Sequence, residues 1–142
     1  MTIATILGGK GHEVVSIAGD RTVAEAVRLL AERRIGAVPV IEGDAVIGIF
    51  SERDVIHSLE RDGAAALDRR VSELMTSPAI TVAPGESILG ALALMTRRRI
   101  RHLPVIESGR CIGLVSIGDL VKHRIERIEK EAEAMRAYIQ AV

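Results

Sequence analysis

The sequence predicts an α/β chain in which one small unit is built twice. An apolar string with a central proline occupies residues 34–41, and a matching string returns 65 residues later at 99–106. A second pair of strings, at 47–54 and 112–119, has the same separation. In each copy the strings have the pattern of two buried strands followed by a Ser-x-x-Asp helix start. A constant separation marks an internal repeat, and two similar units usually pack about a pseudo-two-fold axis.

Each element of the first copy has a local signal. Thr22 and Glu25 form a capping box, and the apolar residues that follow recur every three or four positions, which indicates one buried helix face. Ser51 starts the next helix, and Gly63 ends it. The elements expected in this copy are a helix over residues 2–7 stopped by Gly8-Gly9, a strand over 14–17, a helix from 22, strands over 35–41 and 45–50, a helix over 51–63 and a linker over 64–70.

The second copy repeats this order of elements. Ser87 caps its first helix, and Ser108-Gly109 turns its hairpin. The expected elements are a helical turn over residues 72–75, a strand over 80–82, a helix from 87, strands over 100–106 and 111–116, and a last helix from 117 to about 140.

The last helix continues past the end of the repeat, and neither glycine nor proline stops it. Its apolar residues are spaced alternately four and three positions apart, which is the a/d pattern of a two-helix contact. They are Val121, Ile125, Ile128, Ala132, Met135 and Ile139. This seam packs either on its own domain or against a second subunit. The chain has no second helix of this kind, which favours the subunit contact and predicts a homodimer.

The repeated strings resemble a tandem pair of CBS domains, the cystathionine β-synthase-type regulatory module. The resemblance lies in two Pro-Val-Ile-Glu strings, two Ile-Gly-h-h-Ser-x-x-Asp strings (h apolar) and Glu-Leu-Met-Thr at 73–76, and it spans nearly the whole chain. It implies two βαββα units packed through their sheets, with two clefts that typically bind AMP, ADP, ATP, NAD or S-adenosylmethionine. The expected domains are residues 8–63 and 71–126, followed by an extended C-terminal helix over 127–142.

Composition narrows the classes of function. The 19 basic and 19 acidic residues balance, which argues against a surface built wholly for nucleic acid or anionic membrane, although a local patch is compatible with this balance. No run of 18 apolar residues and no secretory leader are present, so a cytoplasmic protein is expected. The four histidines are not spaced as a metal site, and no nucleophile signature is present. We therefore expect no enzyme, no metal and no required cofactor.

The Ser-x-x-Asp strings have two interpretations. Ser51 and Asp54, like Ser116 and Asp119, can simply cap helices. Alternatively, each carboxylate lies at a cleft floor and accepts both ribose hydroxyls, beside a helix N-terminus that suits phosphate. Recurrence in both copies favours the second interpretation. The resemblance implies Asp54 and Asp119 as ribose-contacting residues and the two serines as neighbours of ribose or phosphate.

Basic residues differ between the copies. Arg101 and His102 precede the proline of the second copy, and in related domains basic residues here contact phosphate. The alternative is a solvated basic edge continuous with residues 97–99. The first copy has Gly36 and Ala37 at these positions, which carry no charge. For the adenine we expect an apolar slot, whose expected members are Ile17, Val38, Val82 and Leu103.

The two clefts are therefore expected to be unequal. In related pairs each cleft takes its carboxylate from one copy and its lead-in from the other. The Asp119 cleft is expected to gather Ser116, Arg101 or His102, and Lys10 with Gly9 and Gly11. The Asp54 cleft is expected to gather Ser51 and Thr76, with no base unless Arg53 turns inward. These assignments predict that the Asp119 cleft binds a phosphorylated ligand more tightly.

Together these features predict a stand-alone regulatory protein that senses an adenosine-containing ligand and signals through an effector protein. One alternative is a nucleic-acid-binding module that uses the basic residues at 97–101. The other is a structural dimerisation module whose clefts bind nothing. Binding that collapses with salt would identify the first alternative.

Overall fold

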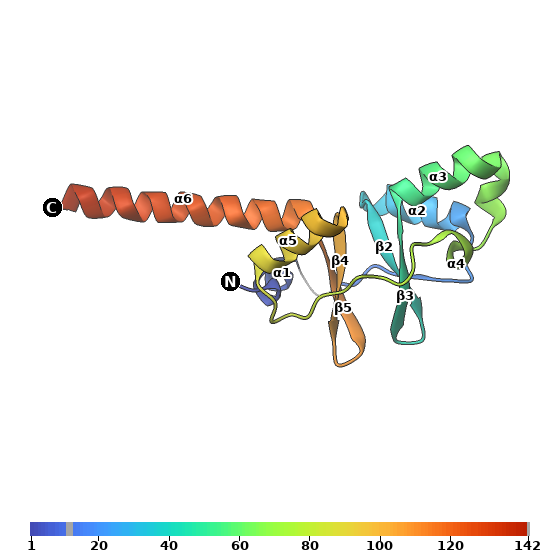
Figure 1. Cartoon of the computed structure of the whole chain (residues 1–142), viewed down its shortest axis with the longest axis horizontal. Helices are drawn as coiled ribbons and strands as arrows, with labels where there is room; N and C mark the ends of the chain where they lie inside the picture. Colours follow the sequence, from blue (N-terminus) through green and yellow to red (C-terminus); the bar gives the residue numbers. More distant parts are fainter. Residues whose placement is uncertain (11–12, 142) are drawn as a thin grey trace.

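The structure, a computed structural model, describes residues 1–10 and 13–141 of the chain. It consists of two small α/β halves that lie side by side, with one long helix extending from the second half (Figure 1). The first half holds β1 (Ile17–Ala18), α2 (Val23–Arg33), β2 (Ala37–Glu42), β3 (Ala45–Ser51) and α3 (Glu52–Asp62). The second half holds α5 (Ile88–Arg98), β4 (His102–Glu107), β5 (Arg110–Ser116) and α6 (Ile117–Ala141).

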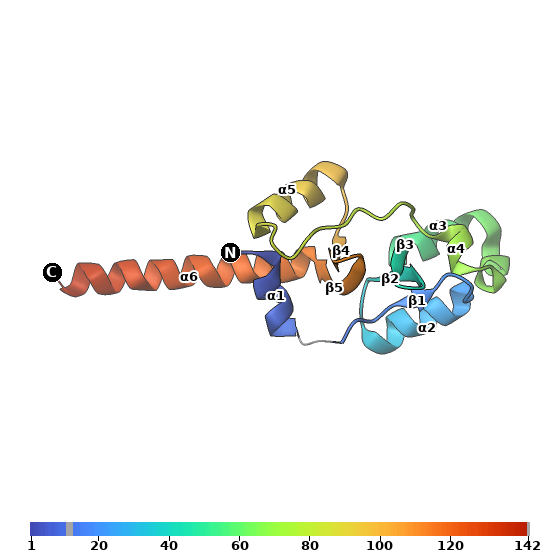
Figure 2. The same cartoon turned by 90° about the horizontal axis from the view of Figure 1, so that it is seen from below.

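Three further helices lie within residues 1–10 and 13–141. They are α1 (Ile3–Lys10), the 3-10 helix η1 (Gly63–Asp68) and α4 (Val71–Leu74). The N-terminal helix α1 packs on the second half, where Ile3 and Ile6 join the buried cluster of that half. Figure 2 shows α1 beside β5 and the start of α6, across the molecule from β1. The chain therefore begins on one half and then crosses to build the other.

The two sheets confirm the internal repeat. In the first half β1 pairs parallel with β2, and β2 pairs antiparallel with β3. In the second half β4 pairs antiparallel with β5. The pairing of Val40 with Gly48 recurs as Val105 with Gly113, and the register shifts after both. The halves contact each other through β3 and β5, as expected for units packed through their sheets (Figure 1).

Apolar residues at the expected positions form two cores, one in each half. They are aliphatic apart from Phe50, which is fully buried. The helix caps are also confirmed, since the side chains of Thr22, Ser51 and Ser87 each accept a hydrogen bond from the backbone N–H three residues later.

The first expected strand of each copy is wrong in length. Residues 14–17 and 80–82 were expected, but β1 covers two residues and Val82 makes a single bridge to Val105. The register places the preceding residues opposite Pro39 and Pro104, which have no N–H to donate to a ladder. Pro104 supplies only its carbonyl, which accepts from the Val82 N–H at 3.0 Å.

Two other expectations are corrected. The first helix was expected to stop at Gly8-Gly9, but α1 continues through both to Lys10. Glycine in a helix costs about 1 kcal/mol, which the burial of Ile3 and Ile6 on the second half can offset. The linker at 64–70 is largely folded as η1, with Ala66 buried. Within residues 1–10 and 13–141, the structure contains no helix whose length and apolarity suit a membrane crossing.

The repeat offers a matched pair of substitutions at Gly48 and Gly113. A Cβ at Gly48 would lie 2.8 Å from the backbone oxygen of Thr76, whereas a Cβ at Gly113 would meet the flexible end of Leu7 at 2.6 Å. Gly48→Ala should therefore lower the free energy of unfolding by about 1–3 kcal/mol, and Gly113→Ala by less. Urea denaturation of both variants measures the difference. Gly85→Ala is the control, because a Cβ there meets nothing within 4 Å. Equal losses at Gly48 and Gly113 would contradict this explanation.

Candidate functional site

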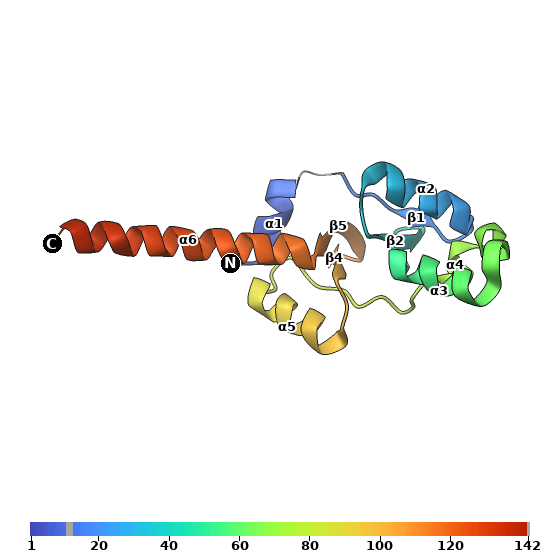
Figure 3. The same ribbon diagram turned by 90° about the horizontal axis from the view of Figure 1, so that it is seen from above.

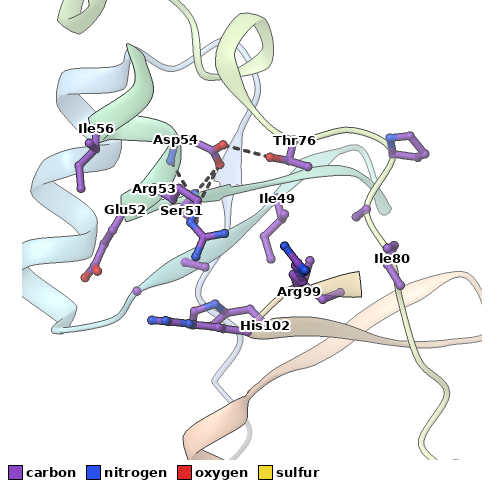
Figure 4. Close-up of a pocket in the computed structure, with 16 residues that line it drawn as sticks. Ile49, Ser51, Glu52, Arg53, Asp54, Ile56, Thr76, Ile80, Arg99 and His102 are labelled. Atoms are coloured by element: carbon purple, nitrogen blue, oxygen red, sulfur yellow. Dashed lines mark hydrogen bonds between the residues drawn. The ribbon is translucent and has the colours of Figure 1, made fainter. Parts of the chain in front are cut away.

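A cavity of about 440 Å³ lies beside the first half, on the side of α3. It is formed by the start of β2, the junction of β3 with α3, the extended segment at 76–80 and the segment at 99–102 that leads into β4. Figure 4 shows these side chains surrounding the cavity from both halves of the molecule. Its volume falls within the range of roughly 300–1,000 Å³ that is typical of small-molecule sites.

The carboxylate of Asp54 is held rigidly at one side of this cavity. Its Oδ2 accepts hydrogen bonds from the Ser51 N–H at 2.9 Å and the Ser51 hydroxyl at 3.1 Å. Its Oδ1 accepts from the Thr76 hydroxyl at 3.0 Å (Figure 4). Each carboxylate oxygen can accept about two hydrogen bonds, so the Oδ1 atom keeps a free acceptor position. The helix cap and the candidate ligand contact are therefore the same side chain in two roles.

Thr76 reaches Asp54 because its segment pairs with β3. The Ile49 N–H donates to the Thr76 carbonyl, and the Thr76 N–H donates to the Ile49 carbonyl, both at 2.9 Å. Gly48 permits this approach, since it has no side chain to meet the Met75 and Thr76 backbone. The lead-in of the second copy thus completes the cleft of the first, as expected.

Four basic side chains line the same cavity. They are Arg53, Arg99, Arg101 and His102. The expectation that the Asp54 cleft holds no base other than Arg53 is wrong. His102 is also near Asp119 and is paired with Ser116 in the sheet, so its expected position beside the Asp119 group is present as well. The start of β4 lies against the start of β2, where a Cβ on Gly36 would be only 3.2 Å from the imidazole of His102. The small, uncharged Gly36 and Ala37 therefore leave room for the basic side chains of the other half.

His102 lies between the two Ser-x-x-Asp groups. Burial lowers its pKa below the ordinary value of 6.5, and this outweighs the opposite effect of Asp119 and Glu52. The nearby Lys10 and Arg101 lower the pKa further. The neutral form of the imidazole is therefore favoured, and an anion entering the cavity would favour its protonation.

The Asp119 group is closed by an internal ion pair. Lys10 Nζ lies 2.6 Å from Asp119 Oδ2 and donates to the Leu114 carbonyl at 2.9 Å. Burial acts to raise the pKa of Asp119, but hydrogen bonds from Lys10 and Ser116 hold it below its usual value. The expected grouping of Lys10, Ser116 and Asp119 is present. However, the charge of Lys10 is already matched by Asp119, so this group offers little net positive charge to an anion.

The sequence did not identify every residue of the cavity. Arg99 was treated as part of a basic edge, yet its left-handed backbone (φ 55°) ends α5 and turns the chain toward the cavity. The apolar wall is also different from the expected slot: Ile17, Val38, Val82 and Leu103 are buried in the cores. The wall consists instead of Ile49, Ile56, Pro78, Ala79, Ile80 and Ile100.

One residue expected at the Asp119 cleft, Gly11, lies outside the described residues. Over residues 1–10 and 13–141, no three His, Cys, Asp or Glu side chains are grouped as ligands for a metal ion.

Comparison with known proteins gives one consistent result. The CBS domain family model matches residues 11–61 and 71–126. A relative from Arabidopsis thaliana, the CBS domain-containing protein CBSX3, mitochondrial, is 35% identical over 98% of this chain and 72% of its own length. The CBS-domain containing protein ATU1752 from Agrobacterium tumefaciens has a solved structure with a TM-score of 0.82 and 39% identity, over 87% of this chain and 92% of that one.

A second solved structure carries a ligand. It is the CBS domain protein PAE2072 from Pyrobaculum aerophilum, complexed with AMP. It is 26% identical to this chain with a TM-score of 0.75, over 84% of this chain and 89% of that one.

The burial of His102 predicts a pH dependence of stability. Because its folded pKa lies below 6.5, the folded protein leaves His102 neutral where the unfolded chain already binds a proton. The free energy of unfolding should therefore fall as the pH is lowered from about 7 to about 5, and His102→Gln should reduce this fall. Denaturant titrations at both pH values measure it. His57→Gln, at an exposed position, is the control. An undiminished fall in His102→Gln would contradict the assignment.

Proposed function

The chain belongs to the CBS domain family as a tandem pair of CBS domains, and we propose that it is a regulator that binds an adenosine-containing ligand and signals through a partner protein. The observation that carries this proposal is the combination of groups around one cavity of about 440 Å³. A fixed carboxylate, four basic side chains and an apolar wall converge there. These are the groups that a ribose, a phosphate and a purine base require.

Each part of the ligand has a proposed partner. Asp54 accepts from the ribose hydroxyls through the acceptor position that Thr76 and Ser51 leave free. Arg101 and Arg53 bind the phosphate, because guanidinium groups donate in pairs to phosphate oxygens. His102 adds a charged donor when it takes up a proton from solvent, which the negative charge of the phosphate favours. The base lies against the wall that includes Ile49 and Ile80.

AMP is the ligand that we place first. The complex of PAE2072 with AMP supports this choice, because that protein shares the fold and a quarter of its sequence with this chain. A single phosphate also matches a single cluster of basic side chains at this cavity. ADP, ATP, NAD and S-adenosylmethionine are the other candidates, and the charge of the cavity favours the phosphorylated ones.

We propose that the Asp54 cleft is the main site and the Asp119 group a weaker one. A ligand at Asp119 must displace Lys10 from an ion pair and from the Leu114 carbonyl. The partner protein receives the signal without catalysis by this chain, since the proposed role uses only binding. No cofactor is required beyond the regulatory ligand.

Calorimetric titration with AMP and adenosine tests the site. We expect one AMP per chain at the tight site, and Asp54→Asn should weaken AMP binding at least tenfold. Arg101→Ala should weaken AMP by about one to two decades, since a charge-assisted hydrogen bond contributes roughly 1.5–3 kcal/mol. Adenosine, which has no phosphate, should bind Arg101→Ala and the wild type equally.

The matched control is Asp119→Asn, which changes the same group in the other copy and should keep tight AMP binding. Loss of AMP binding in this variant but not in Asp54→Asn would overturn the assignment of the main cleft. If none of the five adenosine compounds binds, the structural-module alternative replaces the sensor. Binding to nucleic acid that falls steeply with salt, without competition by AMP, would favour the nucleic-acid alternative.

A further inference from the structure

The long helix α6 leaves the body of the protein, and the described part of the chain covers only its first turns. Its first turns contact α1, α5 and β5, and Leu120 there is fully buried. Beyond these turns it extends away from both halves, as all three views show (Figures 1, 2 and 3). A free helical segment of this length is marginally stable in water unless its apolar side is covered.

The apolar seam of α6 is exposed from root to tip. Val121 is 42% exposed, Ile125 51%, Met135 61% and Ile139 65%. The seam therefore does not pack back on its own domain, which was one of the two interpretations of the sequence. Val121, at the start of the seam, is left partly uncovered by the body of the protein.

We propose that α6 pairs with α6 of a second copy of this chain as a parallel, in-register, two-stranded coiled coil. The heptad pattern places Ile125, Ala132 and Ile139 at the a positions, and Val121, Ile128 and Met135 at the d positions. Isoleucine at a positions is compatible with two parallel strands.

The charges beside the seam fit this arrangement. In a parallel pair, each g position faces the e position five residues later on the partner helix. Arg124 then faces Glu129 of the second copy, and Glu131 faces Arg136 of the second copy. Two-fold symmetry doubles both pairs, so four pairs of opposite charge flank the seam.

The antiparallel arrangement of the same length is disfavoured by the same charges. In an antiparallel pair, each e position faces an e position of the partner helix, and each g position faces a g position. Full overlap of the two seams would therefore bring Glu129 against Glu129 of the second copy. It would also bring Glu131 against Glu131 of the second copy, and Lys122 against Arg136 of the second copy. Each of these contacts is repulsive. The charge pattern therefore selects both the occupant, which is a second copy, and its direction.

The oligomeric state tests this inference independently of any ligand. Light scattering should give the mass of a dimer at micromolar concentration, and Ile128→Asp should give a monomer with an unchanged fold, because that side chain is 49% exposed. A monomeric wild type, or a dimer that survives Ile128→Asp, would overturn the proposal.

Charge reversal tests the direction of the helices. Arg136→Glu should raise the dimer dissociation constant about tenfold, since two attractive pairs become repulsive. Glu131→Arg should act in the same direction. An equimolar mixture of these two variants should recover a heterodimer, because both of its 131–136 contacts then join opposite charges.

The control for charge reversal is Lys130→Glu. It makes the same change in charge on the outer face of the helix, at an f position, and should leave the dissociation constant unchanged. In the antiparallel arrangement Arg136→Glu would instead face Lys122 and strengthen the dimer. That result, or no recovery in the mixture, would overturn the parallel arrangement.

Discussion

The close approach of each lead-in to the hairpin of the opposite copy is the constraint on which the rest of the structure depends. In the first half, Thr76 joins β3 by two backbone hydrogen bonds, over Gly48. In the second half, α1 lies against β5 at Gly113. Neither half is therefore built from consecutive residues alone, and each cleft depends on a segment that the chain supplies from elsewhere. This exchange also explains why a chain of two small units can bury two aliphatic cores.

The sequence predicted what depends on local pattern or on repetition. The repeat located both hairpins and both Ser-x-x-Asp helix starts, and the absence of a stop signal after residue 117 predicted the full length of α6. The short first strands were also within reach, because Pro39 and Pro104 cannot donate to a ladder. The continuation of α1 through Gly8-Gly9 was not, since it depends on burial against a half that lies far along the chain.

The placement of basic side chains in the Asp54 cavity could not be predicted from the sequence, because it also depends on contacts between segments that lie far apart along the chain. Arg101 and His102 follow one another on the second copy, so the repeat assigns them to the Asp119 cleft. Their position in the Asp54 cavity as well depends on how the start of β4 faces the start of β2. Similar backbones thus give different clefts: one is lined by three arginines and His102 beside Glu52 and Asp54, and in the other Lys10 is paired with Asp119. Two small differences between the copies produce this asymmetry: Gly36-Ala37 against Arg101-His102, and Lys10 in one lead-in against Thr76 in the other.

Because α6 is continuous, a small tilt at its start produces a larger displacement at its end. Asp119 lies in its first turn and forms an ion pair with Lys10. The same 25-residue helix continues without a break to Ala141. At 1.5 Å per residue the helix is about 36 Å long, so a tilt of about 5° at its root displaces its tip by about 3 Å. A rigid tilt of the first turn of α6, where Asp119 lies, is therefore amplified into a displacement at the far end. The geometry of the helix alone connects the chemistry of the cleft to a point well outside the body of the protein.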